Sequence, residues 1–139
     1  MKIKPSNFEL QVLGVLWEAP GLTVREVRER FSDGKARAYT SVLSVMQVME
    51  RKGLLSRRRP EKGSADLWTA AVRRDEVSRP LLRRLMDQVF GGRPSMVMQH
   101  LLDAKSVDRE EVAEIRRLLE AYESELDDKE GSSKGKSKR

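Results

Sequence analysis

The chain has 139 residues and a net charge of +6, which allows one ordinary domain or a small domain with a helical appendage. It contains no cysteine, which excludes disulfides and thiolate metal sites and is typical of proteins in a reducing cytosol. The N-terminus lacks a long apolar segment, so we expect neither a signal peptide nor a membrane span, and we expect a cytoplasmic protein.

The charge is unevenly distributed along the chain. Residues 1–72 hold 13 Lys and Arg against 8 Asp and Glu, residues 73–128 hold 10 against 13, and residues 129–139 hold 5 against 1. A basic segment followed by an acidic one is typical of a DNA-binding half joined to a self-associating half. A small basic protein that contacts nucleic acid only non-specifically is the alternative.

The first two predicted helices each begin with a capping box, in which Ser or Thr is followed three residues later by Glu. The first helix runs from Ser6 to about Ala19, and its apolar stripe consists of Val12, Leu13, Leu16 and Trp17. The second helix runs from Thr23 to Phe31, with Val24, Val27 and Phe31 facing inward. Pro20-Gly21 separates the two helices, and Ser32-Asp33-Gly34 forms the next turn.

The third predicted helix has one apolar and one polar face. It begins at Arg37 or Ala38 and ends at Gly53, where a left-handed cap is needed. The apolar residues recur at spacings of three and four and are Tyr39, Val42, Leu43, Met46 and Met49. The polar face carries the groups that hydrogen-bond base edges and phosphates: Arg37, Thr40, Ser41, Ser44, Gln47 and Arg51.

A basic hairpin follows this helix. Residues 55–59 and 66–70 are predicted strands on either side of the turn at residues 60–64. Three helices followed by a hairpin predict a winged helix-turn-helix, and a recognition helix beside a basic wing is suited to holding DNA. Because side chains alternate along a strand, the wing arginines cannot all face DNA, and we assign Arg58 and Lys62 to the backbone contact.

The segment from residue 73 is predicted to be entirely helical. A first helix ends at Gly91-Gly92, a short helix capped by Ser95 covers Met96 to Leu102, and a last helix starts after Asp108, its predicted cap. Their apolar side chains exceed what a 50-residue appendage can bury alone, which indicates a dimer. The assigned dimerisation residues are Leu82, Leu85, Val89, Phe90, Leu101, Ile115, Leu118, Leu119 and Tyr122. The alternative is that these helices fold back onto the winged domain as one monomeric core.

The fold class is therefore mainly α with a small β-hairpin wing: an N-terminal winged helix-turn-helix and a C-terminal helical dimerisation domain. We place the DNA-binding domain at residues 1–72, the dimerisation domain at 73–126, and a disordered basic tail at 127–139, where apolar residues are absent.

Four motifs resemble the penicillinase-repressor (BlaI/MecI/CopY) family of winged helix-turn-helix transcriptional repressors. They begin at Glu9-Leu10-Gln11-Val12-Leu13, Thr23-Val24-Arg25-Glu26-Val27, Tyr39-Thr40-Ser41-Val42-Leu43 and Asp87-Gln88-Val89-Phe90-Gly91, in the family's order and spacing. The resemblance covers roughly residues 6–122. It implies repression of transcription by a homodimer bound to a palindromic, double-stranded DNA operator.

The resemblance also raises the question of how repression ends. In antibiotic-responsive members a regulatory protease cuts an Asn-Phe bond, and the corresponding bond here is His100-Leu101, so both residues differ. Copper-sensing members use a cysteine cluster, which this chain lacks. A single histidine without a cysteine partner is more typical of a packed or surface residue than of a metal ligand, and we expect no metal and no cofactor.

Other classes of function fit less well. The chain has no His/Cys nucleophilic pair and no phosphate-binding glycine loop before a helix, so we do not expect an enzyme. A winged helix that binds another protein usually lacks a basic wing, and Arg57-Arg58-Arg59 argues against that function. An activator is the alternative to a repressor, because a DNA-binding surface does not encode the sign of regulation.

Overall fold

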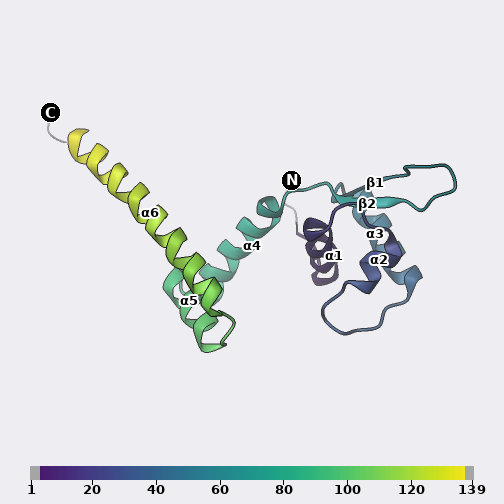
Figure 1. Ribbon diagram of the computed structural model, residues 1–139, viewed down its shortest axis with the longest axis horizontal. Helices are drawn as coiled ribbons and strands as arrows, with labels where there is room; N and C mark the ends of the chain where they lie inside the picture. The colour runs from purple at the N-terminus through teal and green to yellow at the C-terminus, as the bar shows by residue number, and fades with distance from the viewer. Residues whose placement is uncertain (1–3, 137–139) are drawn as a thin grey trace. The chain divides into compact units, whose positions relative to one another are not determined.

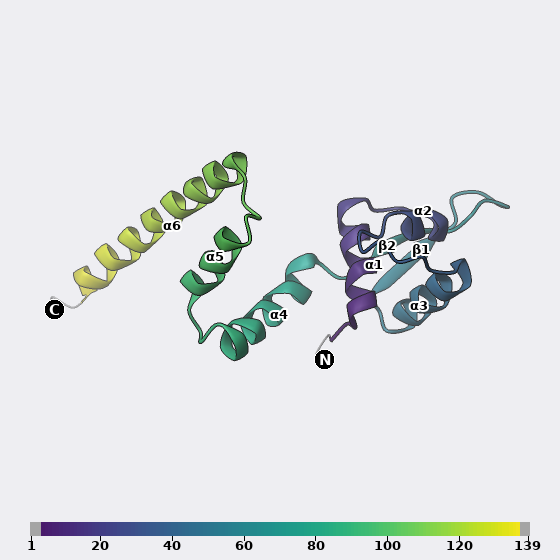
Figure 2. The ribbon, with the colours of Figure 1, turned by 90° about the horizontal axis from the view of Figure 1, so that it is seen from below.

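The computed structural model describes residues 4–136, with side chains described as far as Gly131, and divides into two compact units. The first unit is Met1–Arg84 and the second is Leu85–Arg139. The first contains three helices gathered beside a two-stranded hairpin, and the second is helical (Figures 1 and 2). The chain is thus mainly α with one small hairpin, as predicted.

Both predicted capping boxes are formed in the first unit. In α1 (Asn7–Glu18) the Ser6 hydroxyl accepts from the Glu9 N–H, and in α2 (Val24–Glu29) the Thr23 hydroxyl accepts from the Glu26 N–H. Each glutamate in turn accepts from the backbone N–H of its capping residue. These reciprocal bonds satisfy backbone donors that a helix start otherwise leaves unpaired, which fixes where both helices begin.

The recognition helix α3 (Tyr39–Arg51) leads directly into the hairpin. Gly53 follows it with φ +81°, a left-handed conformation that glycine adopts without strain. Strands β1 (Leu55–Arg58) and β2 (Leu67–Ala70) pair antiparallel, with Leu55 opposite Ala70 and Arg58 opposite Leu67. In both views the loop between the strands projects away from the three helices (Figures 1 and 2).

The hairpin is joined to the helices by one buried aromatic residue. Trp68 is 1% exposed, and its backbone N–H donates to the Leu22 carbonyl at 2.7 Å. Around it lies an aliphatic core drawn from all five elements and the start of α4. The core is made of Val12, Leu13, Leu16, Leu22, Val24, Val27, Val42, Met46, Met49, Leu54, Leu55, Trp68 and Val77. Since this core spans α1 to β2, it sets the positions of α3 and the hairpin together.

The boundary between the units differs from the predicted one after residue 72. Helix α4 (Arg74–Val89) begins inside the first unit, and Val77 is 4% exposed in its core. The Trp17 indole N–H donates to the Val72 carbonyl at 2.9 Å, and Arg74 forms an ion pair with Glu18. These contacts join residues far apart in sequence, so the change to helical periodicity at residue 73 did not reveal them.

The second unit contains the rest of α4, α5 (Pro94–Asp103) and α6 (Arg109–Lys136). Helix α5 begins at Pro94 and not after a Ser95 cap as predicted, because the fixed φ of proline suits the first helical position. The predicted cap of α6 is confirmed, since the Asp108 carboxylate accepts from the Glu111 N–H at 2.8 Å. None of the side chains described between Leu85 and Gly131 is fully buried.

The apolar residues that we assigned to dimerisation are largely exposed in the single chain. Exposure ranges from 41% to 63% for Leu82, Leu85, Val89, Leu101, Leu118, Leu119 and Tyr122. Phe90 and Ile115 are half-buried, and Phe90 packs edge-on against His100, with ring centroids 5.0 Å apart. Large exposed apolar patches are typical of surfaces that associate with a partner.

Residues 127–136, part of the tail that we predicted to be disordered, continue α6 as helix in the structure. Helix propagation adds one hydrogen bond for each residue fixed, which favours extending a helix already formed. Residues 137–139 lie outside the described residues.

Across residues 4–136, no helix combines the length and the apolarity needed to cross a membrane.

Candidate nucleic-acid interface

The outer face of α3 is polar and exposed. Val42, Met46 and Met49 are fully buried on the opposite side and fix the rotation of the helix. The residues left exposed are Thr40, Ser41, Ser44 and Arg51, whereas Gln47 is half-buried at the edge that faces the hairpin. Of our four candidate base-contacting residues, Thr40, Ser41 and Ser44 therefore lie exposed on one face and Gln47 lies at its rim; Arg51, our candidate for a backbone contact, is exposed as well.

Arg37, which we assigned to DNA contact, is held by residues of its own domain. Its guanidinium forms an ion pair with both oxygens of Asp33 and lies over the rings of Phe8 and Phe31, 4.6 and 4.9 Å from their centroids. Arg37 precedes α3, whose N-cap is Ala38. A residue at the edge of a polar face can thus close the turn between α2 and α3, with its two terminal nitrogens bonded to Asp33.

The ion pair between Asp33 and Arg37 shifts the pKa values of both groups. Hydrogen bonds from Arg37 and from the Lys35 backbone hold the pKa of Asp33 well below its usual range. The same pair raises the pKa of Arg37. Both groups are therefore charged at neutral pH, and the pair persists across the physiological range.

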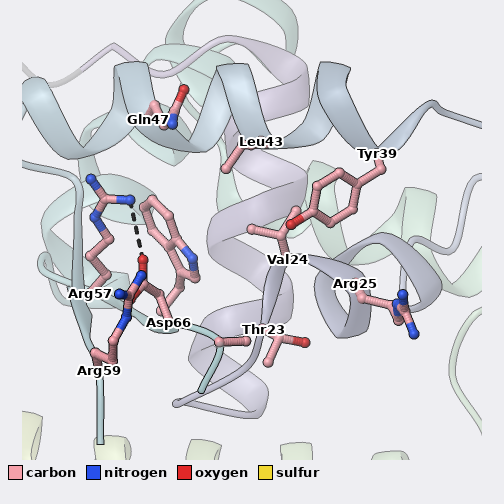
Figure 3. Close-up of a pocket in the computed structure, with 11 residues that line it drawn as sticks. Thr23, Val24, Arg25, Tyr39, Leu43, Gln47, Arg57, Arg59 and Asp66 are labelled. Atoms are coloured by element: carbon pink, nitrogen blue, oxygen red, sulfur yellow. Dashed lines mark hydrogen bonds and ion pairs between the residues drawn. The ribbon is translucent and has the colours of Figure 1, made fainter. Parts of the chain in front are cut away.

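Tyr39 was predicted to lie in the buried stripe, but it is 45% exposed. It is the first residue of α3, where the helix has no preceding turn to pack against, and it points into the space beside the hairpin (Figure 3). The period of three and four assigned Tyr39 to the correct edge of the helix. It did not reveal that the buried part of α3 begins only at Val42.

The C-terminal end of α3 is tied to α1 by an ion pair that the sequence did not suggest. Lys52 Nζ lies 3.0 Å from Glu9 Oε2, and the Glu9 side chain is 6% exposed. Burial raises the pKa of Glu9, but hydrogen bonds from Ser6 and Lys52 and the charge of Lys52 outweigh burial and leave the pKa below its usual value. The pair fixes the point where α3 passes into the hairpin.

The basic residues of the hairpin fall into two sets. Arg57 pairs with Glu50 at 3.0 Å and with Asp66 at 3.3 Å, and its guanidinium lies 5.1 Å from the centre of the Trp68 ring. Arg59 pairs with the other oxygen of Asp66 at 3.0 Å. Arg58 and Lys62 are exposed and form no ion pair with any residue that the structure describes. These last two were our predicted backbone contacts.

A groove of about 550 Å³ separates α3 from the hairpin. Figure 3 shows Tyr39, Leu43 and Gln47 along the α3 side, with Arg57, Arg59 and Asp66 opposite them and Thr23, Val24 and Arg25 beneath. Trp68 and Ala65 complete the lining. Three of the lining residues are arginines and one is an aspartate, so the groove is positively charged. In the part of the chain that the structure describes, no cluster of His, Asp or Glu could hold a metal ion.

A sequence profile described as penicillinase repressor matches residues 5–121. The chain belongs to the penicillinase repressor family. It is accordingly a DNA-binding transcriptional repressor of the winged-helix type and not an enzyme.

No curated protein sequence matches this penicillinase-repressor family member. Solved structures with similar chains include Streptococcus pneumoniae FabT in complex with DNA, with a TM-score of 0.46 and 20% identity over 90% of this chain and 78% of that one. The S. aureus MepR G34K mutant has a TM-score of 0.44 and 19% identity over 88% and 80%. Bacillus subtilis PadR in complex with operator DNA has 0.41 and 16% over 93% and 76%. At these scores the likeness carries no argument beyond the elements described above.

The His100-Leu101 bond, which the resemblance aligns with a protease site of antibiotic-responsive members, lies inside a helix. His100 and Leu101 belong to α5, where His100 Nδ1 is 2.9 Å from the Met96 carbonyl oxygen. A protease needs an extended backbone, so cutting between them would require α5 to unfold locally.

Proposed function

We propose that this repressor binds its operator as a homodimer, with α3 in the major groove and the basic hairpin on the backbone. The observation that carries the proposal is the orientation of α3. Buried Val42, Met46 and Met49 direct Thr40, Ser44 and Arg51 outward on an exposed face next to a positively charged hairpin. Hydroxyl, amide and guanidinium groups are those that read base edges and grip phosphates.

Within this proposal the residues have distinct roles. Thr40, Ser41, Ser44 and Gln47 contact base edges or adjacent phosphates, and Arg51 grips the backbone from the end of the face. Arg58 and Lys62 contribute the charge of the wing, since neither is held by a carboxylate in the described chain. Arg37 is removed from the contact set because Asp33, Phe8 and Phe31 hold it.

The homodimer is supported by the exposed apolar side chains of the helical second unit. Leu85, Val89, Leu119 and Tyr122 are 45% to 63% exposed, and association with a second copy would bury them. A symmetric dimer carries two recognition helices, so the proposed operator is a palindrome whose half-sites lie one or more helical turns apart. We place this activity in the cytoplasm, and a regulatory protease acting at His100-Leu101 stays a prediction.

A titration of the purified protein against its own upstream intergenic DNA tests the proposal. Fluorescence anisotropy is measured with a scrambled competitor over a salt series. If each protomer neutralises four phosphates, log K against log salt should slope by about −7. Ser44→Ala and Arg51→Ala should weaken binding, whereas Arg117→Ala in the second unit should not. A slope near zero, or equal affinity for scrambled DNA, would contradict an operator-specific repressor.

A further inference from the structure

We propose that the groove between α3 and the hairpin binds a phosphate of the operator backbone, with Arg59 as its donor and Asp66 as the positioning residue. This inference rests on the proposed function and adds a site that the polar face of α3 alone does not predict. Its basis is the arrangement of one carboxylate and two guanidiniums on the wall of the groove.

Asp66 divides its two oxygens between two arginines. Oδ2 accepts from Arg57 Nη1 at 3.3 Å, and Oδ1 accepts from Arg59 Nε at 3.0 Å. Because the second bond uses only Nε, neither terminal nitrogen of Arg59 donates to another described residue. A guanidinium held at Nε keeps its outer edge available for an anion and loses the freedom that would otherwise oppose binding.

The two arginines are not equivalent. Arg57 is also held by Glu50 at 3.0 Å and lies over Trp68, so its side chain is only 38% exposed. Arg59 has an exposed fraction of 60% and lies farther along the hairpin. Arg57 is therefore part of the wall that supports Asp66, whereas Arg59 is the group that reaches a ligand.

The occupant we infer is a phosphodiester of the DNA strand that separates the two grooves. A recognition helix in the major groove and a wing beside it must straddle that strand, and the groove lies between them. Arg25, Tyr39 and Gln47 also line this space and add a charge, a phenol and an amide suited to a phosphate and its sugar. The charges on the lining, three arginines against one aspartate, favour an anion.

Asp66 gives the inference a test with opposite outcomes. If Asp66 acts only as a negative charge near DNA, then Asp66→Asn should strengthen operator binding. If it positions Arg59, the same change should weaken binding several-fold, and Asp66→Glu should recover part of the loss. Asp128→Asn on α6 removes the same charge in the second unit and serves as the matched control.

The site itself is tested with operator duplexes that carry one neutral methylphosphonate at successive backbone positions, measured by anisotropy. Wild-type protein should lose roughly tenfold affinity at one position in each half-site. Arg59→Ala should lose a similar amount on ordinary DNA, lower the salt slope by about 1.8 for two protomers, and lose nothing more at that position. In the Asp66→Asn variant, the methylphosphonate at that position should cost less affinity than in wild type. The Arg117→Ala variant should behave as wild type.

Two results would overturn the inference while the proposed function survives. One is that the loss of affinity caused by Arg59→Ala adds in full to the loss caused by the methylphosphonate, whichever backbone position carries it. The other is a gain of affinity in Asp66→Asn. Failure of the wild-type protein to prefer its operator would overturn the proposed function and this inference together. Circular dichroism on each variant confirms that Arg59→Ala, a change at an exposed side chain, leaves the fold intact.

Discussion

The ion pair between Glu9 and Lys52 should be the main polar tie between α1 and the end of the recognition helix. The Glu9 side chain is 6% exposed, and its two oxygens accept from the Ser6 N–H at 2.9 Å and from Lys52 at 3.0 Å. Lys52→Ala leaves one oxygen of a buried carboxylate without its partner. We expect this change to lower the free energy of unfolding by about 1–2 kcal/mol.

The magnitude lies at the low end of the range for buried pairs because the Lys52 side chain is 53% exposed. Water can reach the vacated position and solvate Glu9 in part, and a pair with one exposed member is screened. The loss should therefore exceed that of a surface pair, which is below about 1 kcal/mol, without reaching the 3–5 kcal/mol of a fully enclosed one.

Urea denaturation followed by tryptophan fluorescence measures the free energy of unfolding of the first compact unit, which contains Glu9 and Lys52. Both tryptophans of the chain, Trp17 and Trp68, lie in the first unit, so their fluorescence reports its unfolding and not that of the second. A double-mutant cycle with Glu9→Gln isolates the pair. Lys52→Ala should cost less than about 0.5 kcal/mol in the Glu9→Gln background.

Equal costs of Lys52→Ala in the two backgrounds would refute the reasoning, because the loss would then not come from the carboxylate. A loss below about 0.5 kcal/mol in the wild-type background would refute it as well, since that is the scatter of ordinary surface changes. Lys62→Ala, at an exposed lysine in the hairpin loop without an ion pair among the described residues, is the matched control.

Three further outcomes are expected. Because the pKa of Glu9 is lower in the folded protein than its unfolded value of 4.5, the ionised carboxylate stabilises the fold above that pH. The stability advantage of wild type over Glu9→Gln should therefore be lost as the pH falls below about 4.5. An advantage that persists in acid would contradict this. Arg37→Ala should lower the melting temperature but leave the salt slope unchanged, whereas Arg51→Ala should lower the slope by about 1.8 without altering the melting temperature; the reverse pattern would restore Arg37 as a DNA contact. Leu119→Asp, at a side chain 54% exposed in the single chain, should convert a dimer to a monomer in analytical ultracentrifugation, and an unchanged mass would show that this face is not the interface.

The sequence by itself determined the order of the elements and the faces of the helices. Capping boxes at Ser6 and Thr23 are local bonds between residues three apart, so their pattern is readable without tertiary contacts. The same holds for the buried residues Val42, Met46 and Met49, whose spacing follows the helical period, and for Gly53, whose positive φ ends the helix. These features identified a winged helix with a polar recognition face.

Only the tertiary structure decided which charged groups are free. Arg37, Arg57 and Arg59 look alike in the sequence, but their roles depend on carboxylates and rings that folding brings beside them. The Glu9–Lys52 pair joins residues 43 positions apart, and the extent of the first unit depends on contacts of Val77 with a core begun at Val12. Periodicity specifies the face on which a side chain lies. The partner it meets there is set by long-range packing, which a local pattern does not encode.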